Sequence, residues 1–226
     1  ELLRLDPTTG EREVLLTEKS SFWINLHDML FEGFPADWTL DGSAKASGDF
    51  FFIWSSERSG FAQLYLYQYV AAQKKCVVLL GGKPIGGGGD WVVLDINAVD
   101  CAKRVVYFTA NRGNHSEKHL FRASFASEEL ATNSIERLTQ QNGTHTCAVS
   151  LSQGVFADVY SSTAALPTMS LHTIPPMNSS SELLTELLGR DRSHPYPSDN
   201  LMPLVAHIVP PSIEIIRSGD DKVDLY

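Results

Sequence analysis

The chain of 226 residues contains little cysteine, no excess of positive charge and no long apolar run. Its cysteines, Cys76, Cys101 and Cys147, are too few and too scattered for a disulfide framework or a zinc site, so we expect free, buried thiols. Free thiols favour a reducing compartment and therefore a cytoplasmic protein. The formal net charge of −9 argues against a nucleic-acid partner, because no basic stripe is present to release counterions. No apolar stretch reaches the roughly 18 residues of a membrane-spanning helix, so we expect no membrane partner either.

Three Asn-x-Ser/Thr triplets match the acceptor pattern for N-glycosylation and are the reason to consider a second cellular location. They begin at Asn114, Asn142 and Asn178. Such triplets also arise by chance in loops rich in serine and threonine. A secreted protein or a membrane-anchored ectodomain is therefore the alternative to a cytoplasmic one.

The motifs of common catalytic and cofactor sites are missing from the sequence. No Gly-x-Ser-x-Gly nucleophile elbow occurs. The glycine run 81–90 has Pro84 where a phosphate-binding loop needs Ser or Thr, and a strand-like segment follows it where a helix would be required. We therefore interpret the run as a flexible connection and predict no cofactor.

Histidine and glutamate pairs in the sequence also lack the spacing of a functional site. His115 and His119 do not fit a zincin motif, so we expect a solvated loop and no metal there. Glu128-Glu129 is expected to be a solvated turn between strands. The remaining histidines that we considered have no neighbours suggesting a base or a ligand, and are His145, His172, His194 and His207.

The segment Asp49–Tyr69 predicts a β-hairpin. Two runs rich in aromatic and β-branched residues flank the polar pentad Ser56–Gly60, which favours strand, turn and strand. The second run has aromatic side chains on both faces, which indicates a strand covered on both sides, as in stacked sheets. The aromatic residues that we expect in the core are Phe51, Trp54, Phe61, Tyr65, Trp91, Tyr107 and Phe108.

This hairpin unit recurs along the chain. Further copies lie at Arg104–Phe125 and Gly154–Thr173, follow-on strands at Cys76–Leu80 and Ile135–Thr139, and preceding strands at Trp91–Asn97 and Cys147–Leu151. A loose period of about 50 residues with roughly four short strands is typical of propeller blades. We predict an all-β partial β-propeller of about three four-stranded antiparallel blades with one short helix. A non-repeating β-sandwich is the alternative.

The two ends of the chain carry further elements. Leu2–Thr17 predicts a hairpin turned by Asp6–Gly10. Near the other end, Ser180–Gly189 predicts the helix, because serine caps it, leucines form a stripe and glycine stops it. A polar loop, Arg190–Asn200, and a last hairpin within Ile213–Tyr226 follow.

Several segments resemble the N-terminal propeller of the dipeptidyl peptidase IV family. Trp54–Tyr65 resembles the family's Ser-Glu-x-x-Gly-Phe/Tyr-x-x-Leu-Tyr hairpin, and Val106–Phe121 resembles its Val-Tyr-Phe…Glu-x-His-Leu-Tyr blade. Arg137–Cys147 and Tyr160–Pro167 resemble further family segments. Trp23–Asp28 resembles the cytosolic dipeptidyl peptidase 8/9 branch.

The resemblance implies a domain organisation. In this family an eight-bladed propeller caps an α/β-hydrolase domain that removes Xaa-Pro dipeptides from peptide N-termini. Residues 1–208 would be propeller blades, and residues 209–226 would enter the hydrolase domain. The catalytic Ser, Asp and His would lie beyond Tyr226, and the Glu-Glu pair that holds the substrate ammonium would lie before Glu1. Both ends fall in strand-like runs, so we expect a piece of a longer protein.

The resemblance also implies two site residues. The turn after Trp23 is where the family's propeller reaches the peptide pocket, which makes His27 and Asp28 candidate substrate-binding residues. An ordinary polar turn is the alternative. These residues would shape specificity and break no bond, so we expect no catalytic residue in the chain.

Together these features predict a non-catalytic propeller fragment of a serine dipeptidyl peptidase, acting as substrate gate and scaffold. Its expected partners are a peptide with a penultimate proline, the hydrolase domain of the same chain and a second subunit of a homodimer. The alternatives are a stand-alone propeller-like protein-interaction module and, less favoured, a prolyl-oligopeptidase relative. Exposed strand edges and apolar faces further predict that the isolated chain self-associates.

Overall fold

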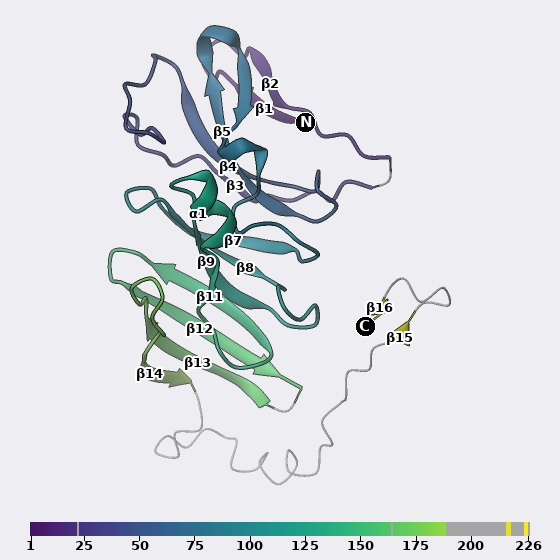
Figure 1. The fold of residues 1–226 in the computed structure, drawn as a ribbon, viewed down its shortest axis with the longest axis vertical. Coiled ribbons are helices and arrows are strands. Elements are labelled where there is room, and N and C mark those ends of the chain that lie inside the picture. Colours follow the sequence, from purple (N-terminus) through teal and green to yellow (C-terminus); the bar gives the residue numbers. More distant parts are fainter. Residues whose placement is uncertain (22, 164, 189–215, 218–223, 226) are drawn as a thin grey trace.

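The computed structural model describes residues 1–21, 23–163, 165–188, 216–217 and 224–225, and these form mainly antiparallel β-structure (Figure 1). The N-terminal hairpin consists of β1 (Leu2–Leu5) and β2 (Arg12–Leu16). The first blade consists of β3 (Leu30–Phe31), β4 (Phe50–Ser56), β5 (Gln63–Val70) and β6 (Lys75–Val78). The second blade consists of β7 (Val93–Asp100), β8 (Val105–Ala110), β9 (His119–Ser124) and β10 (Glu136–Arg137). The third blade consists of β11 (Thr144–Ser150), β12 (Val155–Ser162), β13 (Ala165–Thr173) and β14 (Leu183–Leu188).

Each blade is an antiparallel meander in which every strand pairs with the next one along the chain. The N-terminal hairpin and the three blades follow one another along the long axis of the molecule in chain order (Figure 1). A further pair, β15 (Ile216–Arg217) and β16 (Asp224–Leu225), lies in the last predicted hairpin. The prediction of an all-β partial β-propeller with about three four-stranded blades is confirmed.

Apolar side chains on alternate faces of the strands hold neighbouring sheets together. Odd-numbered residues of β4, such as Phe51 and Ile53, pack with Phe108 of the second blade in one buried cluster. Phe52, on the opposite face of β4, packs with Leu2 of the N-terminal hairpin in another. Because side chains alternate along a strand, the first blade is covered on both faces, as its aromatic pattern predicted.

The second and third blades are joined in the same way. Val105 and Tyr107 of β8 form a cluster with Phe156 of β12. The backbone also crosses this interface, since the N–H of Lys118 donates to the carbonyl of Gly143 at 3.0 Å. Most of the aromatic residues expected in the core are indeed buried, but Phe61 is 37% exposed, because it lies in the turn between β4 and β5.

The glycine run 81–90 connects the first blade to the second and packs against the helix α1 (Glu128–Asn133). The N–H of Gly86 donates to the carbonyl of Ala131 at 2.7 Å. Gly87 has a φ of 85°, and a Cβ there would lie 2.4 Å from the Thr132 carbonyl oxygen. Glycine is therefore required at this position both for its backbone conformation and for the close approach of the helix.

Two predictions about helix and turn are wrong. The segment expected to be a helix, Ser180–Gly189, instead contains β14, which pairs with β13. The helix that the structure describes begins at Glu128, where a solvated turn was expected; its Glu128 and Glu129 are exposed, and Ser127 caps it. The edge of β13 offers unpaired backbone groups, and pairing with them outweighs the helical preference of a leucine stripe that has no core to cover.

The three cysteines are free and partly buried. Burial raises the pKa of the Cys76 thiol to about 11 and also raises the pKa of Cys101 and of Cys147. Such thiols are weak nucleophiles at neutral pH. Among the residues that the structure describes, no helix is both long and apolar enough to cross a bilayer.

Candidate functional site

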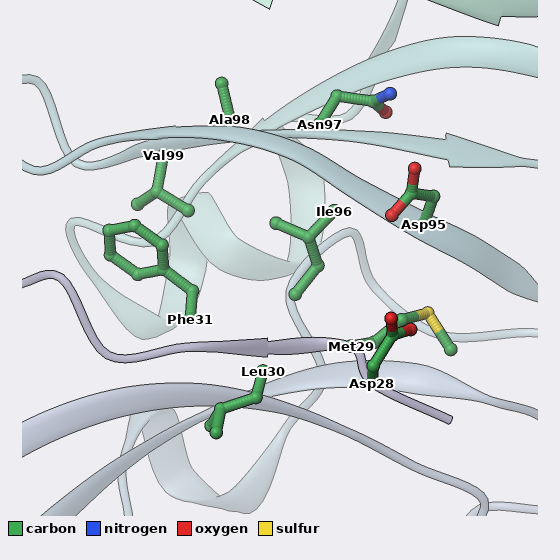
Figure 2. Close-up of a pocket in the computed structure, with 9 residues that line it drawn as sticks. All are labelled: Asp28, Met29, Leu30, Phe31, Asp95, Ile96, Asn97, Ala98 and Val99. Atoms are coloured by element: carbon green, nitrogen blue, oxygen red, sulfur yellow. The ribbon is translucent and has the colours of Figure 1, made fainter. Parts of the chain in front are cut away.

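A cavity of about 270 Å³ lies between β3 and β7, the first strands of the first and second blades. Residues 28–31 line one side and residues 95–99 line the other. Figure 2 shows Phe31, Ile96 and Val99 pointing into the space between the two strands. Apolar side chains therefore contribute to both walls, beside the polar side chains of Asp28, Asp95 and Asn97.

Irregular pairing of β7 shapes its wall of this cavity. The register of β7 against β8 shifts between Val93 and Asp95 and again between Ile96 and Ala98. Such irregularities break the strict alternation of a strand and re-aim side chains, and they are common beside functional sites. Asn97 is fixed there, since its amide donates to the Cys147 carbonyl at 2.9 Å and its Oδ1 accepts from the Thr109 hydroxyl at 2.9 Å. Because Cys147 lies on β11, the first of these hydrogen bonds connects this wall of the cavity to the third blade.

Two carboxylates, from Asp28 and Asp95, lie at the same side of the cavity in Figure 2. Both side chains are exposed. The backbone at Asp28 is held in a tight turn, because its carbonyl accepts from the Leu30 N–H at 2.7 Å. Two carboxylates in a lining that also contains apolar side chains suit a ligand that carries a cationic or hydrogen-bond-donating group next to an apolar one.

His27 does not line the cavity. Its ring packs against Trp54 with ring centroids 4.5 Å apart, and its Nδ1 accepts from the Met29 N–H at 3.2 Å. Because Nδ1 is an acceptor here, the neutral ring carries its proton on Nε2. Of the two predicted substrate residues, the structure therefore brings only Asp28 to the cavity and leaves His27 beside it on the first blade.

The loop before β3 also exposes apolar side chains. Trp23 and Leu26 are among the most exposed large hydrophobic residues described. Asn25 anchors the loop, since its amide donates to Glu57 in the turn between β4 and β5 at 2.6 Å. This loop therefore stands beside Asp28 with an apolar surface available for contact.

A group of buried polar residues joins the second and third blades. His119 is fully buried, although a solvated loop was expected, and its ring centroid lies 5.0 Å from that of His145. Nδ1 of His145 lies 2.8 Å from Asp158, and the Cys147 thiol also faces that carboxylate. The described residues contain no group of three or more such side chains placed to hold a metal ion.

Hydrogen bonding at His119 can be satisfied by a neutral ring. The Thr139 hydroxyl oxygen accepts from the Leu120 N–H, so its hydrogen is free to be donated to Nδ1 of His119 at 3.1 Å. Nε2 of His119 then donates to Glu117 at 2.8 Å. Burial lowers the pKa of His119, and the contact with Glu117 only partly opposes this shift.

We therefore expect acid to destabilise the fold through His119. Its pKa is lower in the folded state than in the unfolded state, so its stabilising effect is present above about pH 6.5 and is lost as the pH falls below that value. The free energy of unfolding, measured by urea denaturation, should decrease between about pH 7.5 and pH 5.5. His119→Gln should flatten this dependence, whereas His115→Gln, in an exposed loop, should leave it unchanged. If the free energy of unfolding depended on pH equally in both variants, the assignment of the acid effect to His119 would be wrong.

A serine–histidine contact is present but is not a catalytic triad. The Ser170 hydroxyl lies 2.8 Å from Nε2 of His172. A triad also needs a carboxylate on Nδ1. Among the described residues none is bonded there, since the oxygens of the nearby Asp158 contact His145 and Cys147.

The sequence reasoning missed Asp95 and Asn97. Both lie within a run that was correctly assigned to a strand, and nothing local distinguishes them from other polar strand residues. Their importance depends on the approach of β3, which is more than sixty residues away in the chain.

Comparison with known proteins gives a consistent set of similarities. The model of the dipeptidyl peptidase IV N-terminal region matches residues 1–167. Dipeptidyl peptidase 8 of Mus musculus is 28% identical over 166 residues, which cover 66% of this chain and 17% of the relative. The Homo sapiens protein of the same name is 27% identical over the same shares. A probable dipeptidyl peptidase 4 of Aspergillus fumigatus (strain CBS 144.89 / FGSC A1163 / CEA10) is 29% identical over 90 residues, covering 39% of this chain and 10% of the relative. The chain thus spans less than a fifth of the length of these relatives.

Proposed function

Because this chain belongs to the dipeptidyl peptidase IV family by its match to the N-terminal region of that family, we propose that it forms the substrate-gating part of a serine dipeptidyl peptidase. The activity that we propose for the whole protein is removal of Xaa-Pro dipeptides from peptide N-termini. Residues 1–208 serve as propeller blades, and residues 209–226 lead into an α/β-hydrolase domain. The catalytic Ser, His and Asp belong to that domain, so the chain alone breaks no bond.

The observation that carries this proposal is the cavity between β3 and β7. Its lining combines apolar side chains with the carboxylates of Asp28 and Asp95. A peptide offers the complementary chemistry, since it has N–H donors, a terminal ammonium and apolar side chains. In this role Asp28 orients the peptide, and His27 supports the loop through Trp54. Both act on binding and specificity and take no part in proton transfer.

The remaining parts of the proposal concern partners and location. We expect a peptide with a penultimate proline as substrate, the hydrolase domain of the same protein as the covering domain, and a homodimer in the intact enzyme. The free thiols favour the cytoplasm. No cofactor is required by a Ser-His-Asp mechanism.

Enzyme assays on Gly-Pro-anilide test the proposal. The chain of residues 1–226 should show no turnover above a buffer blank, whereas the protein encoded together with its flanking gene sequence should cleave the substrate. In that longer protein, Asp28→Asn should raise KM by about three- to tenfold with kcat changed less than twofold, because one charge-assisted contact to the bound peptide is lost. Asp37→Asn, at an exposed residue away from this cavity, is the matched control.

Each contrary result has a defined meaning. Turnover by residues 1–226 alone would overturn the assignment of the chemistry to the hydrolase domain. An unchanged KM in the Asp28→Asn variant would overturn the role of the cavity. No turnover even with the flanking sequence would favour the alternative, a propeller-like protein-interaction module.

A further inference from the structure

The turn that leads into β11 contains the one asparagine of the sequence that is followed by glycine, Asn142. Every other asparagine of the chain precedes a larger residue. An Asn-Gly pair is the sequence in which asparagine loses its side-chain amide most readily, because glycine has no side chain to hinder the approach of its backbone nitrogen to the neighbouring Cγ. The sequence therefore places a chemically reactive pair between the second and third blades.

The structure leaves the reacting groups of this pair accessible. Asn142 is exposed, and its side-chain amide forms no hydrogen bond with any residue that the structure describes. Its carbonyl is held, since it accepts from the Tyr160 hydroxyl at 3.1 Å. The backbone N–H of Gly143 donates to none of the described residues either. No described partner therefore competes for the attacking nitrogen or for the amide that it attacks.

The fold requires glycine at position 143. Its φ is 147°, and a Cβ there would lie 2.5 Å from the Ser161 carbonyl oxygen and 2.8 Å from the Tyr160 ring. Only glycine suits both this backbone conformation and the close approach of β12. The residue that makes Asn142 reactive is thus the one that the packing of this turn demands.

Backbone contacts between the second and third blades pass through the same turn. The N–H of Lys118 donates to the Gly143 carbonyl, and the N–H of His145 donates back to the Lys118 carbonyl, each at 3.0 Å. The Gln141 carbonyl, on the other side of Asn142, lies 2.8 Å from Nε2 of the buried His145 ring. A change in the length of the backbone at Asn142 would therefore disturb the spacing of groups that join the two blades.

We propose that Asn142 is a site of spontaneous deamidation and isomerisation, and that this reaction loosens the junction of the second and third blades. The Gly143 nitrogen forms a bond to Cγ of Asn142, the bond from Cγ to Nδ2 breaks, and ammonia leaves with the proton of the Gly143 N–H. Water then opens the cyclic imide at either carbonyl. One product is aspartate. The other is isoaspartate, whose backbone passes through Cβ and Cγ and is one atom longer. This inference does not depend on the proposed peptidase role.

Peptide mapping by mass spectrometry tests the reaction in the protein encoded together with its flanking gene sequence. Incubation at about pH 8.5 and about 37 °C should raise the mass of the peptide that contains Asn142 by about 1 Da and yield two separable products. Asn133, an exposed asparagine followed by serine, is the internal control and should react at least about tenfold more slowly. Asn142→Gln should abolish the mass change, because the longer side chain closes the corresponding ring much more slowly.

Hydrogen–deuterium exchange measures the effect on the junction. In aged wild-type protein the N–H groups of Lys118 and His145 should exchange at least about threefold faster than in fresh protein. The N–H of Val93, which donates to the Ala62 carbonyl between the first and second blades, should be unchanged. Aged Asn142→Gln should match the fresh protein, and so should fresh Asn142→Asp, which adds the charge without the extra backbone atom.

The contrary outcomes are equally defined. The absence of a mass change at Asn142, or a glycan attached there that blocks the attack, would overturn the proposal. A mass change without faster exchange at Lys118 and His145 would overturn the effect on the junction. Equally fast exchange in fresh Asn142→Asp would overturn the role of the longer backbone.

Discussion

Replacing Arg122 by alanine is expected to lower the free energy of unfolding by about 3–5 kcal/mol, as for other buried ion pairs that lose one partner. Arg122, on β9, is almost completely buried. Its Nε donates to Glu136 at 2.6 Å, and its two terminal nitrogens donate to the carbonyls of Pro175 and Pro176. Without the guanidinium, one carboxylate and two carbonyl groups lose their donors together.

The contacts of Arg122 connect two blades. Glu136 lies on β10 beside it in the second blade, whereas Pro175 and Pro176 follow β13 of the third. The same carboxylate accepts from the backbone N–H of Asn178, so the network extends further along that segment. Loss of Arg122 should therefore weaken the junction of the second and third blades as well as the blade itself.

Urea denaturation of matched variants measures this effect. Arg12→Ala, at an exposed position on β2, should change the free energy of unfolding by less than about 0.5 kcal/mol. Arg122→Lys should fall between the alanine variant and wild type, because lysine keeps the charge but lacks the planar fork that serves three acceptors. A loss below about 1 kcal/mol in Arg122→Ala would show that the network does not hold the blades together.

Local sequence signals were sufficient to predict most of the strands. The hairpin of β4 and β5 follows from two aromatic runs around a polar turn that ends in Gly60, and the structure confirms it with continuous pairing from Phe50–Tyr69 to Ser56–Gln63. The hairpins of β8–β9 and β12–β13 were found in the same way. Such signals involve residues close in sequence, so they can be read without knowledge of the fold.

Predictions that depended on distant partners were less successful. Leucines in the segment that forms β14 fit a helical stripe, but the unpaired edge of β13 decided the outcome. His119 looked solvated because its partner Thr139 lies twenty residues away, and the neighbouring blade then buries it. Propensity alone contains no information about such contacts.

At the candidate site as well, the parts that were not predicted depend on contacts between residues distant in sequence. The position of Asp28 was inferred from a family resemblance, and the structure brings it to a cavity. His27, its neighbour, cannot line the same wall because its ring is held on Trp54. Asp95 completes the carboxylate pair only because two first strands from different blades lie side by side. The candidate site therefore depends on how the sheets stack and on the cores that fix that stacking.

Truncation of Phe108 should consequently be among the most damaging single changes, with an expected loss of about 3–5 kcal/mol in the free energy of unfolding. Phe108 lies on β8, is fully buried, and stacks near Trp91 and Phe121 with ring centroids 6.1 and 6.0 Å apart. It belongs to the cluster that joins the first blade to the second. An alanine there leaves a cavity that neighbouring sheets, already tied by backbone pairing, can fill only in part.

Matched phenylalanine variants separate this packing effect from a general loss of aromatic surface. Phe61→Ala, at the partly exposed position, should cost no more than about 1 kcal/mol, and Phe108→Leu should cost less than Phe108→Ala because it leaves a smaller void. Since the same core joins the first blade to the second, Phe108→Ala should also make the backbone N–H of Val93, which donates to the Ala62 carbonyl of the first blade at 2.8 Å, exchange faster with deuterium. If Phe61→Ala and Phe108→Ala proved equally costly, the cluster between the first and second blades would not be the main determinant of their stacking.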